Sequence, residues 1–164
     1  MKLVAALIIA FGLLAPGFQG MAADLPKKGK FTGNFGWYAV GKPSELEQNH
    51  LYWVGEFAGT FFNDDGKGFM HQSSIVCPGT NDIRLDGAPG GAQGNCIVTD
   101  KEGDKAFLSW KCAGPFPGPC NGDFQWTGGT GKFMGIKGNS KFYAVTIAPT
   151  SSGYSVWNGS WDLP

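Results

Sequence analysis

The chain has 164 residues, a formal net charge of zero at pH 7 and only 16% charged residues, with no basic or acidic block along it. This charge pattern offers no means of recruiting nucleic acid or an anionic membrane surface. Aromatic residues make up 14% of the chain, which supplies enough apolar area for a core despite 27 glycines and 10 prolines, so the composition indicates a folded protein.

The N-terminal segment is typical of a secretory signal peptide. Lys2 supplies a positive charge, Leu3 to Leu14 form a short apolar run, and small residues lead up to Ala22. A run of about a dozen apolar residues is too short to cross a bilayer, which takes about 20. We therefore predict a signal peptide over residues 1–22, with Ala23 as the alternative cleavage point. The protein is expected to be exported, periplasmic or secreted, with no membrane span after the signal peptide is removed.

Residues 23–164 have the usual length of a single domain, and we expect one. Aromatic and β-branched runs recur between glycines at the spacing of an all-β protein. No segment after the signal peptide keeps a helical period over three turns, and Pro43 to Asn49 is predicted to be a polar connection with at most a single turn. The predicted strands are Phe31 to Val40, Leu51 to Phe62, Gly68 to Cys77, Asn95 to Thr99, Lys105 to Lys111, Gly122 to Thr127, Ser140 to Ile147 and Gly153 to Trp161.

Consecutive hairpins with almost no helix favour an antiparallel sheet. Closing the sheet on itself removes exposed edges and suits short, evenly spaced strands. We therefore predict an all-β fold, an antiparallel, closed β-barrel of about eight strands, with a β-sandwich as the alternative.

Two of the predicted turns combine carboxylate or amide side chains with glycine, namely Asn63 to Gly68 and Asp100 to Asp104. The three acidic residues of the second turn also fit the beginning of a calcium loop. The closing glutamate of such a loop is absent, because Lys111 holds its place. We predict a plain turn and no metal.

An even number of cysteines in an exported chain predicts two disulfides, for which three connectivities exist. A zinc site is the alternative, but close Cys-x-x-Cys pairs are missing and only two histidines could supplement the thiolates. We favour one bridge across a long irregular segment between two strands and one around a proline-rich loop. The favoured pairs are Cys77 with Cys96 and Cys112 with Cys120.

Alternation in the second strand separates its two faces. Trp53, Phe57 and Phe61 lie on one face, and Tyr52 and Glu56 on the other, because successive side chains of a strand point to opposite sides. We expect the first face to be the interior. An eight-stranded barrel is either filled by its side chains or just able to hold one small ligand, and the mixture of large aromatics with glycines leaves both outcomes open.

Four residues are candidates for a functional site. His71 shares a face with Phe69 if its strand is regular, and Glu56 lies mid-strand among apolar neighbours. If they face inward, these two are candidate catalytic residues as acid or base; otherwise Glu56 is a solvated charge and His71 a structural histidine. Tyr52, Glu56, His71 and Trp157 are the candidate ligand-binding residues, since aromatic rings stack on planar ligands, with a core role as the alternative for the aromatics.

The sequence indicates no cofactor. The pair Gly131-Lys132 looks like a phosphate-binding loop, but Trp126 stands where that loop needs a glycine and Phe133 where it needs Ser or Thr. No Gly-x-Ser-x-Gly nucleophile motif and no closely spaced histidine pair is present. Hydrolase and metalloenzyme activities are therefore not indicated.

The run from Trp126 to Gly138, followed by the strand Lys141 to Ile147, resembles the Gly-Gly-Thr-Gly-Lys/Arg-Phe-x-Gly-x-x-Gly hairpin corner of allene oxide cyclase and dirigent-type β-barrels. The runs Cys96 to Asp100 and Gly103 to Phe107 are similar to those of small exported bacterial proteins of unassigned function. The resemblance implies a barrel that binds and orients hydrophobic small molecules. It covers the corner and not the cavity, so it assigns no functional residue.

Three functional hypotheses follow. The first is an exported, disulfide-stapled barrel that binds a small apolar or aromatic molecule at its mouth. The second is a cofactor-independent isomerase or cyclase of the allene oxide cyclase type, with Glu56 or His71 as acid or base. The third is an envelope structural or protein-interaction module with exposed aromatics. The sequence does not indicate an oligomeric state.

Overall fold

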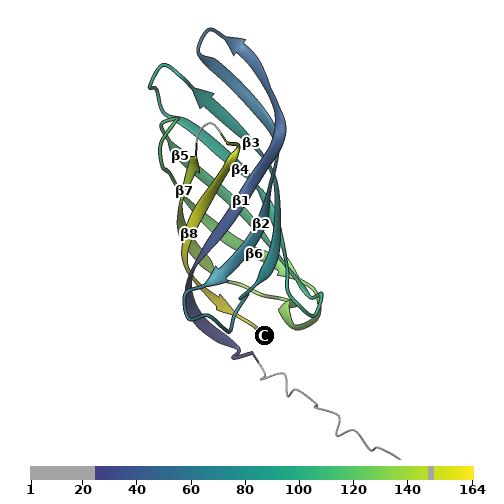
Figure 1. Ribbon diagram of the computed structural model, residues 1–164. Coiled ribbons are helices and arrows are strands. Elements are labelled where there is room, and N and C mark those ends of the chain that lie inside the picture. Colours follow the sequence, from purple (N-terminus) through teal and green to yellow (C-terminus); the bar gives the residue numbers. More distant parts are fainter. Residues whose placement is uncertain (1–24, 148–149) are drawn as a thin grey trace, which may run out of the picture.

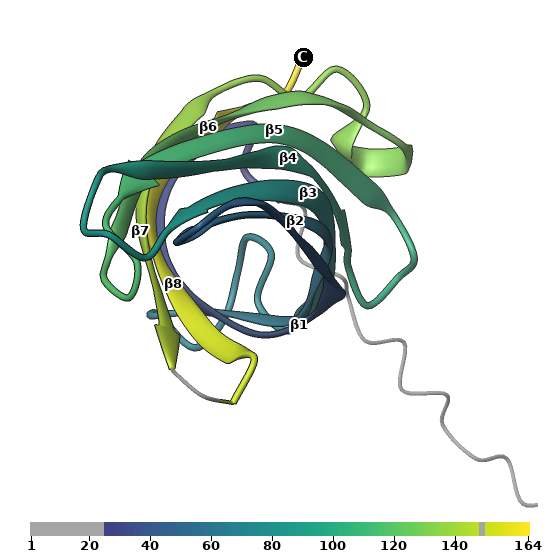
Figure 2. The same ribbon diagram turned by 90° about the horizontal axis from the view of Figure 1, so that it is seen from above.

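The structure is a computed structural model that describes residues 25–147 and 150–164. They form a closed barrel in which each strand pairs antiparallel with the next and β8 returns to β1 (Figures 1 and 2). This confirms the predicted fold. The elements are β1 (Lys28–Glu47), β2 (His50–Asn63), β3 (Ser73–Arg84), β4 (Gly90–Thr99), β5 (Lys105–Gly114), β6 (Cys120–Gly129), the 3-10 turn η1 (Gly131–Phe133), β7 (Asn139–Ile147) and β8 (Ser152–Asp162).

The predicted signal peptide, residues 1–22, lies outside the described residues. Among the residues described, there is no helix with the length and apolarity needed to cross a membrane.

The strands run further at one end of the barrel than predicted. Pro43 to Asn49 is not a polar connection for most of its length, because β1 continues to Glu47 and pairs with β2 in an arm that projects past the barrel (Figure 1). The segment between Cys77 and Cys96 is likewise a hairpin of β3 and β4 rather than irregular chain. The residues of the β1 extension are exposed, so they show none of the apolar alternation by which a half-buried strand is recognised.

Residues Gly68 to Gln72 do not extend β3 as predicted. Gly68, Met70 and Gln72 have φ values of 82°, 56° and 61°, which belong to the left-handed region and not to a strand. The turn folds Phe69 and Met70 into the end of the barrel, where both are buried. His71 therefore does not share a strand face with Phe69, as the regular-strand hypothesis required.

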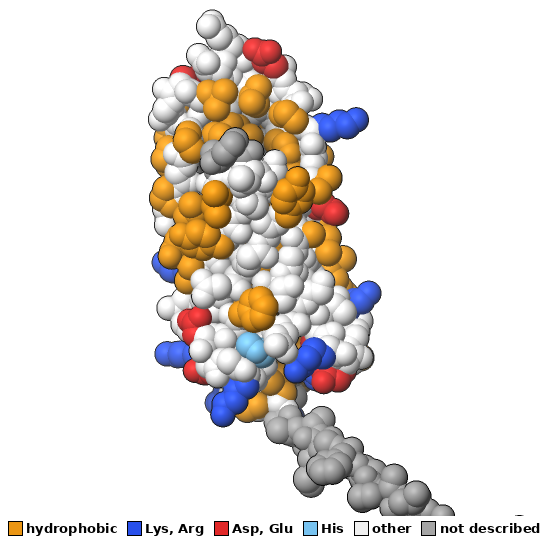
Figure 3. Space-filling view, in the orientation of Figure 1, with side chains coloured by type: hydrophobic (Ala, Val, Ile, Leu, Met, Phe, Trp, Pro, Cys, Tyr) orange, Lys and Arg blue, Asp and Glu red, His pale blue; other side chains and the backbone are white. Residues whose placement is uncertain are grey.

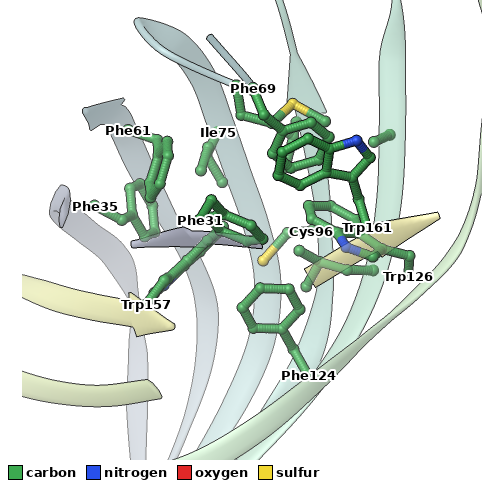
Figure 4. Close-up of a cluster of buried hydrophobic side chains, with 14 of the residues drawn as sticks. Phe31, Phe35, Phe61, Phe69, Ile75, Cys96, Phe124, Trp126, Trp157 and Trp161 are labelled. Atoms are coloured by element: carbon green, nitrogen blue, oxygen red, sulfur yellow. The ribbon is translucent and has the colours of Figure 1, made fainter. Parts of the chain in front are cut away.

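Aromatic side chains close this end of the barrel, which we call the closed end. The ring of Phe69 stacks on that of Trp161, with centroids 4.2 Å apart and planes within 3° (Figure 4). Phe133 and Ile136, from the connection between β6 and β7, are buried beside them. This half of the interior is filled by side chains.

The glycine-rich corner after β6 is also at the closed end, where it holds the turn between β4 and β5. The Lys132 backbone N–H donates to Asp104 Oδ2 at 3.1 Å, and the Lys105 N–H donates to Thr130 Oγ1 at 3.0 Å. Gly131 has a φ of 51°, and a Cβ at this position would collide with the Asp104 carboxylate. Glycine is needed here both for the backbone conformation and for the close approach.

The acidic turn, Asp100 to Asp104, is held by its own hydrogen bonds and by ion pairs with the corner. Asp100 Oδ1 accepts hydrogen bonds from the backbone N–H groups of Glu102 and Asp104, at 3.0 and 2.9 Å. Lys132 forms ion pairs with the carboxylates of Asp100 and Glu102. The glycine-rich corner and the turn between β4 and β5 therefore stabilise each other.

Removing the Lys132 charge is expected to destabilise the protein at neutral pH. Burial opposes ionisation of Asp100, but the hydrogen bond and charge of Lys132, with two backbone amides, outweigh it and lower the pKa of Asp100. The ionised carboxylate thus stabilises the fold above about pH 4, its unfolded pKa, and this stabilisation is lost as the pH falls through the lower folded pKa. Lys132→Met should cost about 1–3 kcal/mol, as expected when a buried polar group loses its partner.

Urea denaturation from pH 7 down to pH 2 measures this effect. The wild type should lose more stability below pH 4 than Lys132→Met does. Lys101→Met, a change of the same kind at an exposed position of the same turn, should follow the wild type. Identical pH profiles for the wild type and Lys132→Met would contradict the assignment.

Candidate ligand-binding site

A cavity occupies the opposite half of the barrel and opens at its other end, which we call the open end. Its volume is about 90 Å³, several times the space that one water molecule requires. The wall is mostly apolar, and its aromatic residues include Phe35, Trp37, Phe57, Trp110, Phe142 and Trp157. The interior is therefore filled at one end and hollow at the other.

Edge-to-face aromatic contacts fix the shape of the cavity wall. The ring of Phe57 lies 5.0 Å from that of Trp37 and 5.9 Å from that of Trp110, with interplanar angles of 77° and 75°. Trp110 meets Phe142 in the same way at 6.3 Å and 77°. Such pairs are favourable beyond the area they bury, so the wall is preorganised.

Both disulfides line the cavity. Cys77–Cys96 joins β3 to β4, and Cys112–Cys120 closes the loop between β5 and β6. These are the two pairs that the sequence favours. The second bridge holds the rim loop, residues 115–119, whose Phe116 faces the cavity.

A charged network lies at the open end. Asp82 lines the cavity, and its Oδ1 is 2.7 Å from His50 Nε2, while His50 Nδ1 is 3.2 Å from Glu47 Oε1. Arg84 forms ion pairs with both Glu47 and Asp86. The hydrogen bond from Arg84, followed by a smaller contribution from the Ala88 backbone N–H, lowers the pKa of the Asp86 carboxyl to about 2. The network ties the β1–β2 arm to β3.

Of the four predicted ligand contacts, only Trp157 lines the cavity. Tyr52 and Glu56 are exposed on the outer face of β2. His71 lies in the turn at the closed end, with its ring 5.9 Å from that of Phe62. The structure does not bring Glu56 and His71 together in the cavity.

Sequence reasoning missed Trp110 and Phe142 as parts of the site. Trp110 alternates with Ser109 and Lys111 along β5, and its side chain lies on the inner face. Alternation does not predict where along the barrel axis the cavity lies.

Hydrophobic side chains also gather on the outer surface, mainly towards the open end (Figure 3). Exposed examples on β1, β7 and β8 are Tyr38, Val40, Tyr143, Ile147 and Tyr154. Simple alternation predicts a uniformly polar outer face. The outer face of this barrel instead carries exposed hydrophobic side chains.

Comparisons with known proteins bear on the fold. No protein-family model matches the chain, and no curated protein matches it significantly. The solved structure of the pterocarpan synthase dirigent protein GePTS1 is similar over 92% of this chain and 100% of that chain, with a TM-score of 0.52. The fold is that of a dirigent-type barrel. The sequence identity is 14%, so the likeness concerns the dirigent-type fold alone, and it agrees with the resemblance carried by the glycine corner.

Proposed function

We propose that this dirigent-type barrel is exported and binds a small apolar or aromatic molecule in its cavity. The observation that carries the proposal is the asymmetry of the interior, filled at the closed end and hollow at the open end. Ligand sites are typically concave, mostly apolar and largely preformed, and this cavity has all three properties.

The wall favours a ring-shaped, weakly polar ligand. Trp37, Phe57, Trp110 and Phe142 present ring edges and faces within one connected set of contacts, and aromatic partners fit such surfaces by stacked or edge-on contact. The carboxylate in the wall is that of Asp82, which His50 already engages.

Export is supported by the two disulfides together with the signal-like N-terminal sequence. Disulfides form and persist in oxidising compartments and are rare in the cytosol of most organisms. The described residues contain four cysteines, and all are bridged.

Filling the cavity tests the proposal. Ala144 lines the cavity on β7, so Ala144→Phe should weaken the binding of a small apolar probe, indane, by at least tenfold. Binding is measured by NMR from the side-chain N–H signals of the six tryptophans. The control is Ala113→Phe, the same substitution at an exposed position of β5, which should bind indane like the wild type.

The cost of overpacking is checked by urea denaturation, since forcing a larger side chain into an interior costs about 1–3 kcal/mol. Unchanged indane binding by a folded Ala144→Phe variant, or no indane binding by the folded wild type, would disprove the proposed function.

A further inference from the structure

We infer that Asn81 selects the ligand of this cavity, because its side-chain amide forms hydrogen bonds with a neutral polar group, a hydroxyl or carboxamide, on an otherwise apolar ring. The inference rests on the proposed function and adds the residue that determines specificity. The ring lies in the aromatic part of the cavity, and the polar group points towards the open end.

Asn81 faces the interior near the open end of β3. Side chains alternate between the two faces of a strand, and Asn81 lies four residues after Cys77, whose bridge to Cys96 is part of the cavity wall. The pairing of β2 with β3 keeps one register from Ser73 to Arg84, so no bulge turns Asn81 outward. Its side chain is partly buried and lines the cavity.

The side chains beside Asn81 leave its amide uncovered. Ala92 lies directly opposite on β4, and Cys112 follows in the same row on β5. Both are small and line the cavity, and directly opposite side chains are only about 5 Å apart. On the other side, the indole of Trp53 lies over Gly41 of β1, away from Asn81.

The amide of Asn81 is accessible and unpaired. Within the part of the chain that the structure describes, no hydrogen bond engages it, and neither of its polar atoms is sealed from solvent. Other polar groups of the wall are engaged, since Asp82 Oδ1 contacts His50 Nε2 and Ser155 Oγ accepts from Trp37 Nε1. A ligand therefore reaches the Asn81 amide without breaking a contact within the protein.

The aromatic wall begins one inner position deeper than Asn81. That position is Gly79, which precedes Asn81 by two residues, about 7 Å along the strand. A Cβ at Gly79 would lie only 2.9 Å from Trp110 Cζ2, so the indole of Trp110 packs against β3 at this level. A ligand ring that contacts Trp110 can present a substituent to Asn81.

The chemistry of the wall defines the class of ligand. The amide of Asn81 both donates and accepts hydrogen bonds, and a hydroxyl or carboxamide matches both capacities. Among the described residues, the cavity wall contains no Lys, Arg or His. A carboxylate would lose its hydration without gaining a cationic partner, and it would approach the carboxylate of Asp82. The polar group is therefore neutral.

Indane, 2-indanol and indane-2-carboxylate are matched probes, because they share one bicyclic frame and differ only in the group at position 2. In the wild type, 2-indanol should bind about fivefold more tightly than indane, the effect of one ordinary hydrogen bond. Indane-2-carboxylate should bind more weakly than both. In the NMR spectrum, 2-indanol should move the side-chain N–H protons of Asn81 further downfield than indane does.

Asn81→Leu keeps the approximate size of the side chain and removes both polar atoms. This variant should retain indane binding and lose the fivefold preference for 2-indanol. Asn95→Leu is the control, the same substitution on the exposed outer face of β4, and it should keep the preference. Urea denaturation shows whether both variants are folded. If Asn81→Leu does not fold, the shift of the Asn81 signals in the wild type decides the question.

The outcomes separate the two proposals. Equal affinities of the wild type for indane and 2-indanol overturn the inference and leave the proposed function intact. So does a preference that survives in Asn81→Leu and disappears in Thr146→Val, because Thr146 lines the cavity from β7. Binding of indane-2-carboxylate as tight as that of 2-indanol also overturns the inference. Failure of the folded wild type to bind any of the three probes overturns the proposed function, and the inference with it.

Discussion

Phe61→Ala is expected to destabilise the barrel by about 3–5 kcal/mol, the cost of deleting a buried aromatic ring. Phe61 is fully buried, with its ring 5.1 Å from that of Trp157 and 5.9 Å from that of Phe31 (Figure 4). It lies where the filled half of the interior meets the cavity, so the surrounding aromatics have little freedom to close the space left behind.

The next residue along β2 is a matched control. Phe62 points outward and is 50% exposed, so Phe62→Ala should cost less than about 1 kcal/mol, as is usual for surface positions. Urea denaturation of the two variants gives both values. Similar losses for the two would mean that β2 does not present Phe61 to the interior.

Removal of the Cys77–Cys96 disulfide has the second large expected effect. Replacing both cysteines by alanine should destabilise the protein by about 3 kcal/mol, because the bridge closes a loop in the unfolded chain and lowers its entropy. Cys112–Cys120 spans 8 positions rather than 19, so its removal should cost somewhat less by the same argument.

Thermal or urea unfolding of the two double variants under non-reducing conditions measures this difference, with the dithiol-reduced wild type as a third sample. The reduced wild type should be less stable than either double variant, since it lacks both bridges. A wild type as stable reduced as oxidised would show that the disulfides do not constrain the unfolded chain.

The strands and their inner faces could be predicted where one face of a strand is buried and the other is exposed to solvent. Alternation in Trp53 to Phe61 assigned the inner face of β2 correctly. It failed for Pro43 to Glu47, since both faces of that arm are exposed. It also failed at Met70 and Gln72, because a non-glycine residue with positive φ leaves no mark in a sequence.

The candidate site was harder to predict, because a cavity forms where the side chains of several strands together leave interior space unfilled. Trp157 was predicted as a ligand contact because its ring could stack on a planar ligand. Trp110 and Phe142 were not, because closure of the sheet decides which inner-face residues lie at the level of the cavity. The contact between His50 and Asp82 depends on the register of β2 against β3. Register follows from the whole sheet and not from either strand alone.

The seal formed by Phe69 and Trp161 at the closed end has a kinetic consequence. A ligand bound as proposed would enter and leave at the open end, where the described residues place the rim loop with Phe116 beside the cavity. A barrier in a shared passage slows arrival and departure by the same factor. If the cavity binds a ligand as proposed, the rim loop would thus set the rates of binding and release, and the aromatic wall would set the affinity.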